Sequence, residues 1–311
     1  MSGILTLNPL SPQAAAISHL FVDILGVLGG IFLIVLVMVG YAIVRYRDRP
    51  GAAPPRQVFG SRKIEIVWTV IPIILLSIIF GFTVRSMHAS DPPITPGTTP
   101  DLRVVAHQWW WEADYLKSGV IAANEIHIPV GQRWLLELDS ADVIHDFWVA
   151  ELARKIDMVP GHPNHIWLEA DRPGTYLGVC AEFCGNEHAW MRFRVIAESA
   201  ADFDRWQRAQ LQVPPKPSGS EAAAGLKLFE QNTCVNCHTI LGTPGNQSIG
   251  PDLTHFASRT TLAAGAADNT NANLYRWLKD PNSIKPDTHM PNFQFDDADA
   301  KALTAYLETL K

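Results

Sequence analysis

The chain has 311 residues, of which 47% are hydrophobic, and its formal net charge is −6 at pH 7. A chain of this length is expected to form two or three domains. With acidic residues in excess, no nucleic-acid partner is expected. The hydrophobic residues are unevenly distributed, because two long apolar runs lie in the first third of the chain.

The first apolar run extends from Leu20 to Val44, with Asp23 as its only charged residue, and the second from Ile66 to Val84. At about 1.5 Å per helical residue the first run covers roughly 37 Å, enough to cross a bilayer with some tilt. Pro72 is tolerable in a membrane helix where a neighbouring helix satisfies the freed carbonyl. We therefore predict a transmembrane hairpin within residues 1–90, with helices at about 19–44 and 65–87.

The orientation follows from the basic residues between the two runs. No Lys or Arg precedes the first run, and the connecting loop carries Arg45, Arg47, Arg49, Arg56, Arg62 and Lys63. The positive-inside rule places this loop in the cytoplasm and both termini on the periplasmic side of a bacterial inner membrane. A signal peptide fits less well, because the charged n-region is missing and the apolar stretch is too long. Everything after about residue 88 is then expected on the outer face.

Residues 91–212 are expected to form an antiparallel β-sandwich or barrel. Short segments with β-branched or aromatic residues are separated by turn signals, the pattern of such folds. These segments begin at Leu102, Glu125, Arg133, His165, Thr175 and Met191.

A metal-ligand motif lies between the last two of these predicted strands. Cys180, Cys184, His188 and Met191 supply two thiols, an imidazole and a thioether within twelve residues. Such soft and borderline ligands favour copper. Two thiolates exceed the need of a mononuclear blue-copper site, so they could bridge two copper ions in an electron-transfer centre.

A second imidazole ligand would have to come from outside this motif. The residues alone do not decide among the candidates, which are His107, His127, His145, His162 and His165.

Residues 199–210 are expected to be helical and 213–220 to be a stiff, Pro-rich linker. Residues 221–311 carry helical patterns at 222–229, 274–278 and 297–310, which predict an all-α domain.

This C-terminal domain contains the attachment motif of a c-type haem. Cys234 and Cys237 would form the thioethers and His238 would bind the iron. Met290 is favoured as the second axial ligand, and His255 and His289 are rivals. Cysteines outside the cytoplasm can instead form disulfides, which here would be Cys180–Cys184 and Cys234–Cys237. The His beside each cysteine pair favours metal and haem binding over disulfides.

Charge is also unevenly distributed along the chain. The net charge is +4 over residues 1–87, −8 over 88–215 and −2 over the remainder. The acidic outer domain would attract a basic partner and speed the encounter at low salt. Acidic surface that merely aids solubility is an equally good explanation.

Together, the copper motif, the helix hairpin and the segment His107-Gln-Trp-Trp-Trp111 resemble subunit II of cytochrome c oxidase, in the bacterial form with a fused class I cytochrome c. The resemblance covers nearly the whole chain. It implies a cupredoxin domain with the binuclear CuA centre. The matching ligands are Cys180 and Cys184 as bridging thiolates, His145, His188, Met191 as a weak ligand, and the carbonyl of Glu182.

The same resemblance implies roles for three further residues. The Glu182 side chain would reach a magnesium or manganese ion at the boundary with the catalytic subunit; alternatively it is an exposed loop acid. Trp109 would be the residue at which electrons enter. Alternatively, at least two of Trp109, Trp110 and Trp111 only pack in the core. Glu65 would stand at the entrance of a proton path, or simply be an acid stabilised at a helix N-terminus.

The expected function is that of an electron-entry subunit. Electrons would pass from a periplasmic cytochrome c or similar donor through one covalent haem to two copper ions. They would then pass to the haem-containing catalytic subunit I, where oxygen is reduced, with subunit III as a further partner. The alternatives are the corresponding subunit of a CuA-type nitric oxide reductase and a membrane-tethered electron carrier or copper-delivery protein.

Overall fold

The computed structural model describes residues 7–51, 57 and 59–311, so Arg56 of the basic loop lies outside the described part. Two compact units can be distinguished. One is residues 15–93, and the other is residues 94–311 together with the segment that ends at Ala14.

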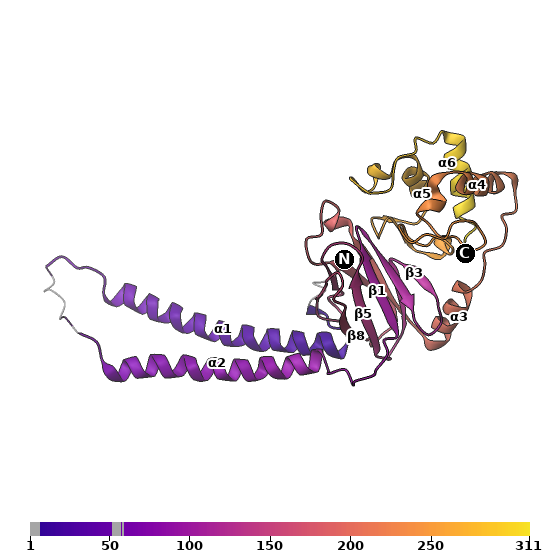
Figure 1. Ribbon diagram of the computed structural model, residues 1–311. Coiled ribbons are helices and arrows are strands. Elements are labelled where there is room, and N and C mark those ends of the chain that lie inside the picture. The colour runs from indigo at the N-terminus through magenta and orange to yellow at the C-terminus, as the bar shows by residue number, and fades with distance from the viewer. Residues whose placement is uncertain (1–6, 52–56, 58) are drawn as a thin grey trace. The chain divides into compact units, whose positions relative to one another are not determined.

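The first unit is a hairpin of two long helices, α1 (Pro12–Arg45) and α2 (Arg62–Ser90), which run beside each other (Figure 1). At about 1.5 Å per residue they span roughly 51 and 43 Å. α1 begins with Pro12, whose fixed φ suits a first helical position, and Ser11 Oγ accepts a hydrogen bond from Ala14 N at 2.9 Å. Both helices extend beyond the ranges expected from hydropathy.

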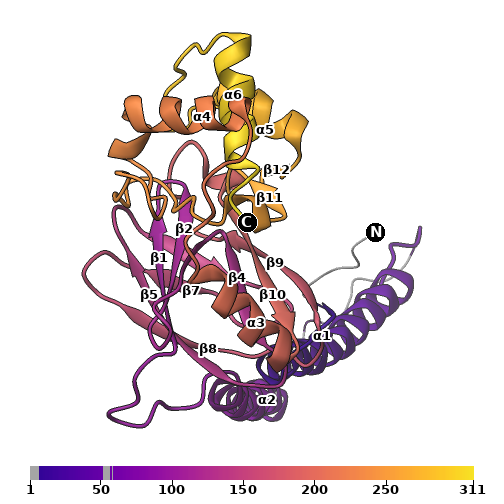
Figure 2. The same ribbon diagram turned by 90° about the vertical axis from the view of Figure 1, so that its right-hand side faces the viewer.

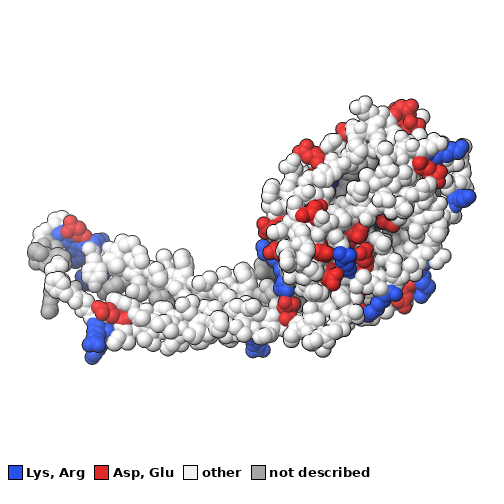
Figure 3. All heavy atoms as spheres, in the orientation of Figure 1, with Lys and Arg blue, Asp and Glu red and all other residues white. Residues whose placement is uncertain are grey.

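The hairpin exposes apolar side chains along most of its length. Figure 3 shows this surface almost free of charge, with Lys and Arg gathered at the loop end. Ser86 Oγ donates to the carbonyl of Ala16 at 3.0 Å and joins the two helices. A lipid bilayer is the solvent in which such a surface is stable.

The second unit contains two five-stranded sheets. The first has the order β3 (Ile121–Ala123), β2 (Trp110–Tyr115), β1 (Leu102–His107), β5 (Trp134–Ser140) and β8 (Asn164–Leu168). The second has the order β4 (Glu125–Pro129), β10 (Arg192–Glu198), β9 (Gly174–Cys180), β6 (His145–Trp148) and β7 (Ile156–Met158).

These sheets confirm the expected sandwich, with one difference in strand direction. β1 pairs with β5 and β4 pairs with β10 in parallel, so each sheet contains one parallel pair among antiparallel ones. Alternation of apolar residues specifies which face of a strand is buried, but not which strand lies beside it. A parallel pair needs a crossover connection, which β2, β3 and β4 supply between β1 and β5.

Aromatic side chains fill the space between the sheets. Trp111, Phe147 and Phe193 are fully buried, with ring centroids 4.7 to 6.0 Å apart. Truncating such a side chain to alanine typically costs about 3–5 kcal/mol. This core therefore provides a rigid base for the loops at its edge.

The C-terminal part is helical, as expected, apart from the two-residue strands β11 (Thr261–Leu262) and β12 (Ala267–Asp268). After α3 (Ala200–Gln210) it contains α4 (Ser220–Gln231), α5 (Asn271–Lys279) and α6 (Asp297–Leu307) (Figure 2). Gly225 lets α4 cross α6 closely, because a Cβ there would lie 2.0 Å from the Ala302 carbonyl oxygen. Phe229 and Tyr306 pack beside this crossing.

Candidate metal centres

The first candidate centre is built on the edge of the second sheet. β6 begins with His145 and β9 ends with Cys180, and the two strands pair directly. The loop from β9 to β10 carries Cys184, His188 and Met191. Cys180 N donates to the Met191 carbonyl at 3.1 Å, which closes this loop at its base.

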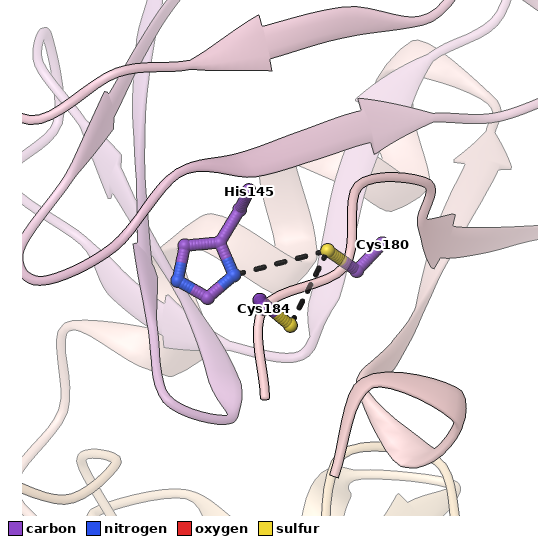
Figure 4. Close-up of side chains that lie close together, drawn as sticks. All are labelled: His145, Cys180 and Cys184. Atoms are coloured by element: carbon purple, nitrogen blue, oxygen red, sulfur yellow. Dashed lines mark hydrogen bonds between the residues drawn. The ribbon is translucent and has the colours of Figure 1, made fainter. Parts of the chain in front are cut away.

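The side chains of the predicted copper motif lie around the two cysteine sulfurs, and Figure 4 shows three of the predicted ligands, His145, Cys180 and Cys184, close together. The sulfurs lie 3.7 Å apart. His145 Nδ1 lies 3.8 Å from Cys180 Sγ, and His188 Nδ1 lies 3.6 Å from Cys184 Sγ. Met191 Sδ is 3.8 Å from Cys184 Sγ, and the Glu182 carbonyl oxygen is 3.2 Å from Cys180 Sγ.

The chemistry of this donor set fits a pair of copper ions. The two thiols are free rather than joined in a disulfide, and each has one imidazole nitrogen beside it. The hydrogen bond between the two thiols lowers the pKa of Cys180 and raises the pKa of Cys184. Both thiols would bind copper as thiolates, so metal binding would release their protons.

Of the five candidates for the second imidazole, His145 is the one whose ring nitrogen lies beside a cysteine sulfur. His107 instead stacks on Trp110 with ring centroids 4.1 Å apart, and burial lowers its pKa to about 4. His127 is bound to Glu198 and His165 lies near Glu137. His162 forms a backbone bridge with Val159.

Asp142 was not anticipated from the sequence. Its Oδ1 lies 2.8 Å from Nε2 of His145, whose other ring nitrogen faces Cys180. Burial opposes protonation of His145, but its hydrogen bonds to Asp142 and Cys180 raise its pKa overall. A carboxylate on the far nitrogen orients the ring and increases its basicity as a ligand.

We expect Asp142→Asn to weaken copper retention about 10- to 100-fold, the range found when such supporting partners are lost. Copper content after graded exposure to a chelator measures this. Asp204→Asn, at an exposed position, is the matched control. Equal retention in the two variants would contradict a supporting role for Asp142.

Two side chains in the turn between β1 and β2 hold the loop of residues 181–191 in place. Gln108 Nε2 and Trp109 Nε1 both donate to the Cys184 carbonyl, at 2.8 and 3.0 Å. The three neighbouring tryptophans pack in two places: Trp109 and Trp111 belong to the sandwich core, whereas Trp110 packs with Ala123 and Ala264. Trp109 itself lies in the turn before β2 rather than in a strand.

The second candidate centre is a cavity of about 440 Å³ in the C-terminal domain. Cys234, Cys237, His238 and Met290 line it, as do Trp109 and Trp110 from the β domain. The largely apolar lining and the free thiols fit a covalently attached haem.

The surroundings of His238 fit its predicted role as an axial haem ligand. Its Nδ1 lies 2.7 Å from the Pro251 carbonyl oxygen, which leaves Nε2 as the ligand atom. Burial lowers the pKa of His238 and favours the neutral imidazole. Gly250 allows the chain to pass over this ring, because a Cβ there would lie 2.6 Å from Cε1.

The two other candidates for the second axial haem ligand, His255 and His289, lie in different surroundings from Met290. His289 also lines the cavity, but its ring lies against Trp109 with centroids 4.5 Å apart. His255 is buried, is not among the lining residues, and has no hydrogen-bond partner for either ring nitrogen in the described part of the chain.

The remaining predicted residues lie on the surface. The Glu182 carboxylate is exposed beside a shallow hollow that Asp157 and Phe183 also line, and Phe183 is 75% exposed. Glu65 is exposed in the first turn of α2. Neither carboxylate completes a metal site or a proton path within the described residues, so both roles require a partner chain.

Family models match three parts of the chain. Residues 4–85 match the model of the cytochrome c oxidase subunit II transmembrane domain, and 117–199 match that of its periplasmic domain. Residues 222–311 match the cytochrome c model.

The chain is also similar to individual relatives over most of its length. Cytochrome c oxidase subunit 2 of Alkalihalophilus pseudofirmus is 39% identical, with 98% of this chain and 90% of the relative covered. The subunit 2 of Bacillus subtilis is 33% identical, with 87% and 82% covered. The periplasmic domain of subunit II of Bradyrhizobium japonicum cytochrome oxidase is 26% identical, covering 38% of this chain and 96% of that one, with a TM-score of 0.36.

Proposed function

The chain belongs to the cytochrome c oxidase subunit II family, and we propose on that basis that it is the electron-entry subunit of a terminal cytochrome c oxidase. It is a membrane protein and a component of a haem-copper oxidase complex. Its family implies copper on the β domain and haem on the C-terminal domain.

In this proposal, an external donor such as a periplasmic cytochrome c reduces the C-terminal domain. Electrons then pass to the β domain and on to catalytic subunit I, which reduces oxygen beside subunit III. When bound, the haem and the copper pair would each accept and release one electron at a time. The chain's own contribution is to hold the ligands and to exclude water.

The position of Trp109 is the observation that carries this proposal. Its indole nitrogen donates to the carbonyl of Cys184, a proposed copper ligand. Its ring lines the haem cavity and contacts His289, the neighbour of Met290. The Trp109 side chain therefore contacts the surroundings of both centres. This favours electron transfer between the two centres over two centres that act independently.

We assign the copper pair to Cys180, Cys184, His145, His188, Met191 and the Glu182 carbonyl. The proposed haem ligands are His238 and Met290, with thioethers from Cys234 and Cys237. The contact of His289 with Trp109 supports Met290 as the axial ligand, because it gives the imidazole a different role. Methionine ligation also raises the haem potential, which suits a terminal acceptor.

Two further roles depend on the catalytic subunit. The exposed Glu182 carboxylate is proposed to bind magnesium or manganese that subunit I helps to coordinate. Glu65 is proposed to stand at the entrance of a proton path. The basic loop supports a cytoplasmic position for Glu65 and a periplasmic position for both redox domains.

Metal and haem analysis of the purified complex tests the proposal. We expect two coppers and one covalent haem per chain, with an electron-spin signal shared between both copper nuclei. Reduction of the haem should precede reduction of the copper when a cytochrome donor is added. A single isolated copper with blue absorption would contradict the binuclear assignment, and copper reduced before the haem would contradict the proposed order.

A further inference from the structure

A buried ion pair joins the loop of Met290 to the loop of His188. The Lys285 side chain is only 4% exposed, and the Glu187 side chain is completely buried. Lys285 Nζ lies 3.3 Å from Glu187 Oε2 and donates to the Trp109 carbonyl at 2.7 Å. Three segments that carry or support the two centres therefore meet at one ammonium group.

Such burial is specific rather than incidental. A charged side chain removed from water is costly unless a partner compensates for it. Neither carboxylate oxygen of Glu187 has a hydrogen-bond partner among the described residues, so within them the ion pair with Lys285 alone compensates its burial. Removing Lys285 would leave Glu187 buried without a counter-charge.

A second anchor lies away from the metal ligands. Glu125, at the start of β4, is 4% exposed. Its carboxylate accepts hydrogen bonds from the backbone nitrogens of Thr260 and Thr261 at 2.9 and 3.0 Å. The two threonine hydroxyls donate to it as well, at 2.6 and 3.0 Å. One carboxylate of the β domain thus binds four donors of the C-terminal domain.

A third contact connects the backbones directly. Arg192 N, at the start of β10, donates to the Ala264 carbonyl at 3.1 Å. Ala264 also packs in an apolar cluster with Trp110 and Ala123 of the β domain. A domain that only moved on a tether would not need buried charges and main-chain hydrogen bonds of this kind.

We propose that Lys285 and Glu187 are positioning residues, which together with Glu125 hold the C-terminal domain in one fixed arrangement on the β domain. This inference rests on the proposed electron-entry function and specifies which residues keep the two centres in a fixed position relative to each other. Lys285 fixes the main chain of Trp109, whose indole is fixed by Cys184. The Trp109 face is then occupied by the chain's own domain, so an external donor delivers electrons to the C-terminal domain.

The test uses Lys285→Met in the complete, metal-loaded complex. Hydrogen exchange of segments 108–110 and 185–190 should become faster than in the unchanged protein. Electron transfer from haem to copper should slow at least ~10-fold, the lower limit found when a supporting partner near a metal site is lost. Lys301→Met, at an exposed position of the same domain, should change neither measurement.

Further readouts separate positioning from general damage. The KM for the external donor should remain unchanged in Lys285→Met. Lys285→Arg should restore part of the rate, because it keeps the charge. In Glu187→Gln combined with Lys285→Met, the loss should be smaller than the sum of the two single losses.

Two results would overturn the inference: unchanged exchange and transfer in Lys285→Met, or purely additive effects in the double variant. If the Lys285→Met complex does not assemble, Glu125→Gln is tested instead. Amide hydrogen exchange at residues 259–262 should then become faster. Unchanged exchange there would contradict a fixed arrangement of the two domains. If haem reduction is never followed by copper reduction even in the unchanged protein, the proposed function fails instead.

Discussion

Exchanging Cys184 for serine is expected to eliminate the paired copper centre and to lower oxygen consumption by the complex more than ~100-fold, beyond the range caused by loss of supporting partners around a metal. The Cys184 sulfur lies within 3.8 Å of the Cys180 sulfur, His188 Nδ1 and the Met191 thioether. One atom thus connects most of the donor set.

A serine hydroxyl cannot replace this sulfur. It is a hard donor that is protonated at neutral pH, whereas copper in such sites prefers soft thiolate. The remaining cysteine, with His145, could still hold one copper ion, so the variant should show at most a mononuclear signal. The haem on the C-terminal domain should then be reduced normally but fail to pass electrons on.

Copper content and electron-spin spectra of the purified variant measure this directly. Asn186→Ser is the matched control, because it places a serine at an exposed position of the same loop. Two coppers and a shared spin signal in Cys184→Ser would show that Cys184 is not a bridging ligand.

The copper site could be proposed from the sequence because most of its candidate ligands lie close together along the chain. Residues 180–191 contain all but one of the proposed copper ligands, and their spacing predicts a common site without knowledge of the fold. His145 is different, since it lies thirty-five residues earlier and reaches the cysteines only because β6 pairs with β9. The residues alone left five histidines as candidates, and His145 was chosen by resemblance.

The supporting residues were beyond sequence reasoning for the same reason. Asp142 resembles any loop acid until its oxygen is seen 2.8 Å from His145. Lys285 and Glu187 are separated by about a hundred residues, and each type is usually exposed. Their burial depends on the contact between two domains, which hydrophobic periodicity cannot describe.

The strand directions illustrate a further limit. Alternating apolar residues predicted a sandwich, and the structure confirms it. The parallel pairing of β1 with β5 follows from where the intervening strands are placed, a tertiary choice that local patterns do not specify. In the C-terminal domain, by contrast, the local helical patterns at 222–229 and 297–310 were enough to predict helices there, and α4 and α6 confirm them.

Replacing both Cys234 and Cys237 by alanine is expected to remove all covalent haem while leaving the copper pair in place. The two thiols line the same cavity as His238, and no other cysteine of the chain lies in this domain. Without the group that fills about 440 Å³ of apolar space, the helices around the cavity should also exchange amide hydrogens faster.

The expected functional result is selective. Oxygen consumption driven by a cytochrome donor should fall to background, whereas a small reductant that reduces copper directly should still support turnover. Haem staining of the denatured chain, copper analysis and the two rates measure these effects, with Gln231→Ala at an exposed position as control. Cytochrome-driven turnover at the original rate would mean that electrons enter at the β domain, and that the fused domain is not an obligatory relay.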